Sequence, residues 1–152
     1  MIMNLTEDMK DLLQLFNKHS VKYMIVGGFA VIAYGYVRLT QDIDILLYPS
    51  KKNAENIKQS IVEFGFGEAG IPWDYFEKEG TAIHLGVEPN RIDLLTHLKG
   101  VDNDTLFNNM QRSDFDGFPI PIISKKDLLK VKLASKRLKD LADAEELSKL
   151  DN

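Results

Sequence analysis

The sequence contains no cysteine among its 152 residues. This absence excludes disulfide bonds, thiolate catalysis and cysteine-based zinc sites. It is compatible with a reducing compartment, and we expect a cytoplasmic protein. The N-terminal residues also lack the basic start and the apolar run that are typical of a signal peptide.

Two nucleotide-binding signatures and a membrane span are missing as well. No Gly-x-x-x-x-Gly-Lys or Gly-x-Gly-x-x-Gly pattern occurs, which excludes a P-loop and a Rossmann site. Residues 23–37 carry no charge, but this stretch is shorter than the ~20 residues that span a bilayer, and glycines interrupt it. The net charge of −4 gives no general attraction to nucleic acid, so an RNA partner would need a local basic patch.

The remaining pattern is that of one globular domain of the α/β (α+β) class. We expect a single domain over residues 1–152, with a core at about 21–123 and flanking helices at about 5–20 and 124–148. Pro119 and Pro121 alternate within 115–123, so any strand there is expected at an edge of the sheet. The other strands are predicted over 23–26, 42–48, 81–87 and 91–96, and the helices over 7–19, 29–36, 51–64, 105–110 and 125–147.

The most informative residues are two aspartates in the second expected strand. Side chains alternate along a strand, so Asp42 and Asp44 point to one face while Ile43 and Ile45 point into the core. Two carboxylates on one face repel each other, and each raises the cost of ionising the other. Because a divalent cation between them would remove that cost, the pair predicts metal chemistry.

A third carboxylate and two glycines extend this candidate site. Asp93 interrupts an apolar strand, where a buried charge is costly without a partner. If that strand lies beside the strand of Asp42 and Asp44, three carboxylates converge and can hold two Mg²⁺ ions together with substrate phosphates. Gly27 and Gly28 end the first strand and suggest a phosphate nearby, although such glycines often serve only as a turn.

This pattern resembles the polymerase-β-like nucleotidyltransferase superfamily. The basic terminal helix, with its Lys and Arg-x-x-Asp, is similar to that of small bacterial members, such as abortive-infection type E toxin-like proteins and small antibiotic nucleotidyltransferases. The resemblance implies a nucleotidyltransferase fold, with a short mixed β-sheet and helices packed mainly on one face. It covers residues 23–143 and rests on an apolar residue before Gly27-Gly28, a helix, the segment Arg38-x-Thr40-x-Asp42-x-Asp44, and a later apolar strand with Asp93.

The resemblance also implies a reaction. A nucleoside monophosphate would pass from an NTP to an acceptor hydroxyl, with release of pyrophosphate. Gly27 and Gly28 would let the backbone approach the triphosphate, whose charge the amides of the following helix would bind. Asp42 and Asp44 would hold two Mg²⁺ ions, and Asp93 would complete the second metal site and take the proton of the acceptor. The acceptor stays open between a small molecule, a protein side chain and an RNA end.

Three further residues are candidates for nucleotide binding. The resemblance places a basic residue of the terminal helix near the phosphates, and we assign this role to Lys132. Arg38 and Thr40 precede the carboxylates, where they would contact phosphate or brace the loop. Most other charges of the terminal helix fit a solvated face with salt bridges.

Other interpretations remain open. An Asp-x-Asp pair also occurs in loops, helix caps and metal-dependent glycosyltransferases. A nucleotide-binding or interaction module without turnover, as one half of a toxin–antitoxin pair, would keep the same fold, but retention of all three carboxylates argues against it. A homodimer would supply the wall of the active site that an added domain forms in larger relatives. His84 and His97 show no metal-ligand spacing and are expected to be structural, and Trp73 is expected to be buried rather than stacked on a base.

Overall fold

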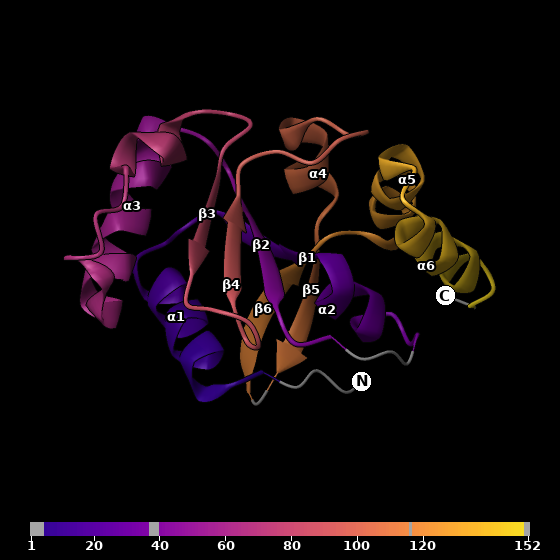
Figure 1. The fold of residues 1–152 in the computed structure, drawn as a ribbon, viewed down its shortest axis with the longest axis horizontal. Helices are drawn as coiled ribbons and strands as arrows, with labels where there is room; N and C mark the ends of the chain where they lie inside the picture. Colours follow the sequence, from indigo (N-terminus) through magenta and orange to yellow (C-terminus); the bar gives the residue numbers. More distant parts are fainter. Residues whose placement is uncertain (1–4, 37–39, 116, 151–152) are drawn as a thin grey trace.

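The computed structural model describes residues 5–36, 40–115 and 117–150 (Figure 1). The helices in this part of the chain are α1 (Glu7–Lys18), α2 (Gly27–Ala33), α3 (Lys51–Ile61), α4 (Asn103–Asn109), α5 (Lys125–Ser135) and α6 (Leu138–Ser148), with an irregular helical turn at Val62–Phe66 and a 3₁₀ helix at Trp73–Glu77. The strands are β1 (Tyr23–Val26), β2 (Ile43–Leu47), β3 (Ala82–Leu85), β4 (Ile92–Leu95), β5 (Gln111–Phe115) and β6 (Phe118–Ile122).

The strands form one mixed sheet in the order β3-β4-β2-β1-β6-β5. Strand β2 pairs antiparallel with β1 and parallel with β4, so β4 lies directly beside the strand of the first aspartates. β3 and β4 form the predicted antiparallel hairpin, and β5 pairs antiparallel with β6. The mixed sheet and the α+β class are therefore confirmed.

Helices α1 and α3 cover one face of the sheet. The Thr6 side chain accepts a hydrogen bond from the N–H of Met9 (3.2 Å) and so caps α1, while Ser50 caps α3 in the same way. The ring of Phe16 on α1 lies 5.3 Å from that of Tyr23 on β1. Tyr23 shares its face of β1 with Ile25, so the apolar side of α1 packs on that face.

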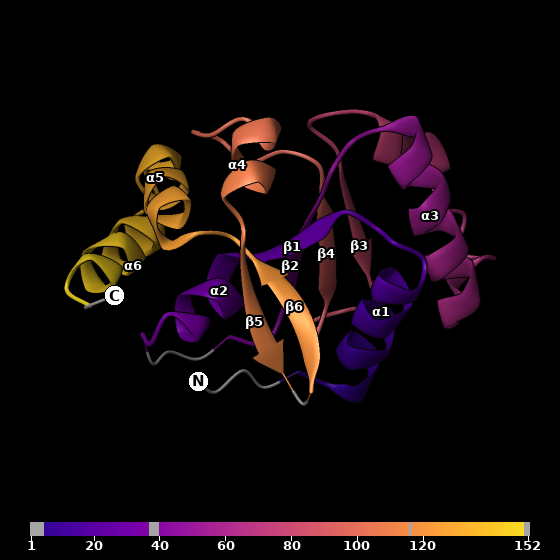
Figure 2. The same cartoon turned by 180° about the vertical axis from the view of Figure 1, so that it is seen from behind.

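The acidic residues lie on the opposite face. Ile25 on β1 pairs with Ile45 on β2, so both side chains lie on the face that α1 covers. Successive side chains along β2 point to opposite faces. Asp44 therefore points away from the α1 side, whereas Ile43 and Ile45 point to that side and are buried. Helices α5 and α6 lie at the other end of the molecule from α3, as both views show (Figures 1 and 2).

The edge-strand prediction for 115–123 is wrong, because β6 lies between β1 and β5. Pro119 and Pro121 occupy alternate positions, so the N–H groups that they lack would all point to one side. Ile123 shares this alternation and donates its N–H to the Ile25 carbonyl (3.1 Å), which identifies that side as the one facing β1. Pairing between β1 and β6 occurs beyond both prolines. The edge strand at this end of the sheet is β5, which was not predicted.

The single terminal helix predicted over 125–147 is also wrong. Lys136 adopts a left-handed conformation (φ 60°), which ends α5 and lets α6 fold back against it. Along one continuous helix, Lys132 and Asp143 would be about 16 Å apart. After the break, the Lys132 Nζ lies 3.1 Å from the Asp143 carboxylate. The turn thus assembles a charged cluster that a straight helix could not form.

The remaining differences are small. Helix α2 starts at the glycines, at Gly27, and ends at Ala33, so it is earlier and shorter than the predicted 29–36. Trp73, expected to be buried, is half-buried: its ring packs against the buried Phe76, and the Lys58 ammonium group lies over it. Within the described ranges, no helix combines the length and hydrophobicity needed to cross a bilayer.

Candidate active site

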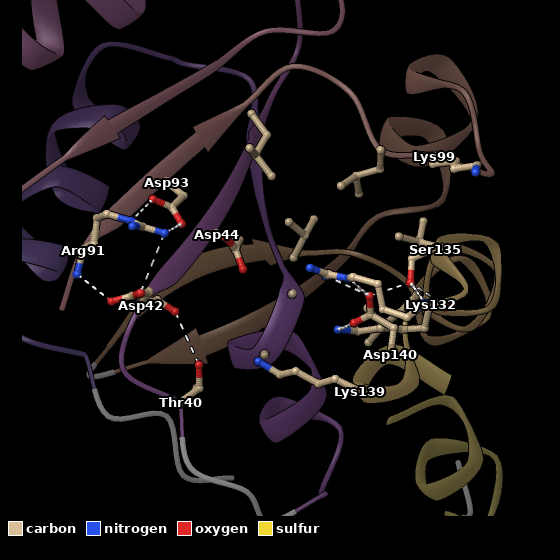
Figure 3. A pocket seen from close by; sticks show the side chains of 18 of the residues that line it. Thr40, Asp42, Asp44, Arg91, Asp93, Lys99, Lys132, Ser135, Lys139 and Asp140 are labelled. Atoms are coloured by element: carbon tan, nitrogen blue, oxygen red, sulfur yellow. Dashed lines mark hydrogen bonds and ion pairs between the residues drawn. The ribbon is translucent and has the colours of Figure 1, made fainter. Parts of the chain in front are cut away.

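A cavity of about 710 Å³ opens between the acidic face of the sheet and helices α5 and α6 (Figure 3). Asp42, Asp44 and Asp93 line one side of it, and Lys132 and Asp140, from α5 and α6, line the other. Of the candidate site residues, those that line it are Gly27, Gly28, Thr40, Asp42, Asp44, Asp93 and Lys132. Arg38 lies outside the described residues.

Asp44 and Asp93 are direct neighbours across the parallel strands β2 and β4. Burial raises the pKa of Asp44 to about 6, and repulsion from the Asp93 carboxylate adds to this effect, while the Lys132 ammonium group opposes it. Asp44 is thus a carboxylate that would gain from a nearby cation.

The Asp93 carboxylate contacts two side chains, those of Arg91 and His84. The Arg91 guanidinium donates from Nε to Asp93 Oδ1 (2.6 Å) and from Nη2 to Oδ2 (3.1 Å). His84 Nδ1 lies 2.6 Å from the same Oδ1. Burial alone would raise the pKa of Asp93, but the hydrogen bonds from Arg91 and His84 lower it below its usual range. Asp93 is therefore ionised at neutral pH.

Asp42 also faces Arg91. The backbone N–H of Arg91 donates to Asp42 Oδ1 (2.9 Å), and the guanidinium Nη2 lies 4.0 Å from Oδ2. In the described part of the chain, no group of three acidic or histidine side chains is arranged to hold a metal ion. The reason is visible in Figure 3, where Asp42 turns toward Arg91 rather than toward Asp44. The donor chemistry nonetheless fits a hard divalent cation, because all three side chains are carboxylates and Asp44 is repelled by its neighbours.

The two glycines leave room beside the acids. Gly27 has a φ of +67°, and a Cβ atom there would overlap the Asp44 carboxylate. At Gly28, a Cβ atom would come within 2.8 Å of Thr40 Oγ1. Side chains at these positions would fill the part of the cavity next to Asp44.

We expect Gly27→Ala to destabilise the protein more than a positive φ alone explains. Alanine in a left-handed conformation costs about 1–2 kcal/mol, and here it would also displace Asp44. Gly70→Ala is the matched control, because Gly70 has a φ of +71° with no atom within 4 Å of its added Cβ. Urea unfolding of both variants makes the comparison, and equal losses of stability would contradict the close contact with Asp44.

Lys132 lines the cavity but is held in a buried ion-pair cluster. Its Nζ lies 3.0 Å from Asp140 and 3.1 Å from Asp143, and all three residues are at least 93% buried. Asp140 also accepts hydrogen bonds from Ser135 and from Arg137, whose Nε lies 2.8 Å away. The cluster fixes the ammonium group at the cavity wall.

This cluster predicts a pH dependence of stability. Burial would raise the pKa of Asp140, but hydrogen bonds from Ser135, Lys132 and Arg137 outweigh it and lower the pKa to about 2. A depressed pKa stabilises the fold above the unfolded value near 3.8, and this contribution is lost as the pH falls toward 2. We therefore expect Asp140→Asn to reduce the loss of unfolding free energy between pH 4 and pH 2. Urea unfolding at a series of pH values measures this. If wild type and Asp140→Asn lose the same unfolding free energy between pH 4 and pH 2, Asp140 is not the group responsible.

Three residues of the site were not predicted. Arg91 and Asp93 are two positions apart near the start of β4, and that spacing on one strand face could have identified Arg91. Asp140 was expected on a solvated face, because the break between α5 and α6 was not foreseen. His84, expected to be purely structural, contacts a candidate catalytic carboxylate.

Neither a known protein family nor a curated protein matches the sequence. Solved structures do match the fold. The lincomycin-bound lincosamide antibiotic adenylyltransferase LnuA is 20% identical, with a TM-score of 0.61 over 97% of this chain and 99% of its own. An antigenic nucleotidyltransferase-like protein from Paracoccidioides brasiliensis is 14% identical, with a TM-score of 0.53 over 94% of this chain and 77% of its own. A third structure, from Thermotoga maritima, is 16% identical, with a TM-score of 0.55 over 92% of this chain and 88% of its own. The chain therefore has a nucleotidyltransferase fold.

Proposed function

We propose that the protein is a nucleotidyltransferase that moves a nucleoside monophosphate from an NTP to an acceptor hydroxyl. The observation that carries this proposal is the pairing of Asp44 with Asp93 across β2 and β4, in a cavity that Gly27 keeps open. Phosphoryl transfer depends on positioning and on stabilisation of the charge that develops on the phosphates. Carboxylates on neighbouring strands can provide both by holding divalent cations, and the glycine turn leaves room for the phosphates beside them. The shared fold supports this assignment.

In this proposal Asp42, Asp44 and Asp93 hold two Mg²⁺ ions. When bound, the ions neutralise the charge that develops on the phosphates and make the acceptor hydroxyl a better nucleophile. The hydroxyl oxygen attacks the α-phosphorus, the bond to pyrophosphate breaks, and the hydroxyl proton passes to Asp93. Gly27 and Gly28 admit the triphosphate, and Arg38, Thr40 and Lys132 are the candidates for contact with it.

The cavity also suits a small-molecule acceptor. Its volume of about 710 Å³ is in the range of small-ligand sites. Part of the wall is apolar and formed by Leu95, Leu98, Leu128 and Val131. Since LnuA is named for lincosamide antibiotics, lincomycin is the first acceptor to test. A role in antibiotic resistance and a role as a toxin that modifies protein or RNA make different predictions for the labelled product.

The test uses α-labelled ATP, GTP, CTP and UTP with Mg²⁺, and offers lincomycin or a cell extract as acceptor. We expect pyrophosphate release and transfer of label to one acceptor class. The second candidate function is a nucleotide-binding module without turnover, which the pairing of Asp42 and Asp93 with Arg91 favours, because it satisfies two of the three carboxylates without a metal. NTP binding without release under any condition would support that alternative.

The homodimer is a separate proposal. Leu133, Leu138 and Leu141 on α5 and α6 are exposed, Leu138 to 86%. Apolar side chains on one helical hairpin would suit contact with a second copy. The molar mass from light scattering decides this point.

A further inference from the structure

Arg91 differs from the other cations of the cavity because it contacts two of the three acids. Its guanidinium makes a two-point contact with Asp93, and its backbone N–H bonds to Asp42. A third carboxylate, that of Glu88, lies 3.2 Å from Nη1. The two-point contact with Asp93 fixes both the position and the rotation of that carboxylate, which a single-point contact cannot do.

The backbone at Arg91 is itself held in place. The N–H of Ile43 on β2 donates to the Arg91 carbonyl (3.0 Å), at the point where β2 and β4 begin to pair. Arg91 therefore has both backbone groups bonded to the segment 42–43, which carries the first acid. The backbone from which the Arg91 side chain extends is therefore fixed relative to β2.

The direction of the contact is informative. In Figure 3, Arg91 lies on one side of Asp93 and Asp42, and Asp44 lies on the other. His84 on β3 also holds Asp93, through Oδ1. Asp44, by contrast, lies close enough to Asp93 for mutual repulsion. Arg91 and His84 therefore contact Asp93 from the side away from Asp44, and the side of Asp93 toward Asp44 stays open for a ligand.

We propose that Arg91, assisted by His84, is a positioning residue that holds Asp93 and Asp42 for divalent-cation binding beside Asp44. This inference rests on the proposed function only in assuming that these acids bind a cation. Groups that bond to metal ligands from behind set their orientation, and their loss typically weakens metal affinity by about 10–100-fold. Arg91 would act through the acids and need not touch the nucleotide.

The test measures Mn²⁺ binding to the whole protein by electron paramagnetic resonance. We expect Arg91→Gln to weaken Mn²⁺ binding by about 10–100-fold. Arg91→Lys keeps the charge but loses the two-point contact, so it is expected to fall between the wild type and Arg91→Gln. Arg112→Gln is the control, because it makes the same change at an exposed residue of β5 that does not line the cavity. We expect its affinity to equal that of the wild type.

Thermal unfolding without metal separates positioning from a merely structural role. A structural role would lower the unfolding temperature of the Arg91 variants and leave their Mn²⁺ affinity unchanged, which would overturn the inference. Tighter binding by Arg91→Gln would overturn it as well, because Arg91 would then compete with the cation. If Arg91→Gln does not fold, Arg91→Lys decides, and wild-type affinity in that variant would refute the positioning role.

Failure of the proposed function can be distinguished from failure of this inference. If the proposed function is wrong, the wild-type protein transfers no nucleotide, whatever the Mn²⁺ affinity of the Arg91 variants. Mn²⁺ binding that depends on Asp44 and weakens with Arg91→Gln, without any transfer, would leave the positioning role intact and remove the catalytic one. A wild type that does not bind Mn²⁺ would refute the positioning role directly.

Discussion

Replacing Asp44 by asparagine is expected to lower nucleotide transfer by about 10³-fold or more. Metal ions supply several kcal/mol of charge stabilisation in such reactions, and each 1.36 kcal/mol corresponds to about a tenfold change in rate. Asparagine keeps the shape of the side chain but removes the charge that would hold the cation. Pyrophosphate release and Mn²⁺ titration, measured on the same preparation, test both parts of this expectation.

The same substitution should stabilise the metal-free protein. Burial and repulsion from Asp93 penalise the ionised Asp44 carboxylate, and the neutral amide avoids this penalty, by on the order of 1–2 kcal/mol at pH 7. Asp11→Asn is the control, because it removes one carboxylate from the exposed face of α1. Activity lost together with stability would indicate a damaged fold. Unchanged Mn²⁺ binding in Asp44→Asn would remove Asp44 from the proposed metal site.

The acidic half of the site could be predicted because it depends on alternation along short strands. Asp44 interrupts an apolar run in β2 and Asp93 does so in β4, and both face away from the core for that reason. The prediction that these strands are neighbours needed one further assumption about the sheet. The register confirms it, with Asp44 opposite Asp93.

The basic half could not be predicted because it depends on one backbone angle. Nothing in the pattern of 125–147 marks Lys136 as the residue that turns left-handed, since glycine usually takes that conformation. Without the turn, Asp140 and Asp143 appear as partners of nearby lysines on an exposed helix. With it, they meet Lys132 in the interior. Long-range packing, which a local pattern does not contain, decides between the two.

Replacing Lys132 by methionine is expected to destabilise the protein by about 3–5 kcal/mol, which is typical when one partner of a buried ion pair is removed. Methionine fills most of the volume of the lysine stem, so the loss arises mainly from charge. Asp140 and Asp143, 2% and 4% exposed, would both lose their contact with the Lys132 ammonium group, while Arg137 would stay paired with Asp140. Urea unfolding at pH 7 measures the effect.

Two comparisons separate the structural role of Lys132 from contact with the nucleotide. Lys130→Met makes the same change on the exposed side of α5, where we expect a loss within about 0.5 kcal/mol. Lys139→Met removes an exposed cation from the cavity wall, so it should weaken ATP binding without loss of stability. Adding Asp140→Asn and Asp143→Asn to Lys132→Met should recover part of the stability, because no uncompensated charge then remains buried. If the triple variant is no more stable than Lys132→Met, the loss of stability arises from packing between α5 and α6 rather than from buried charge.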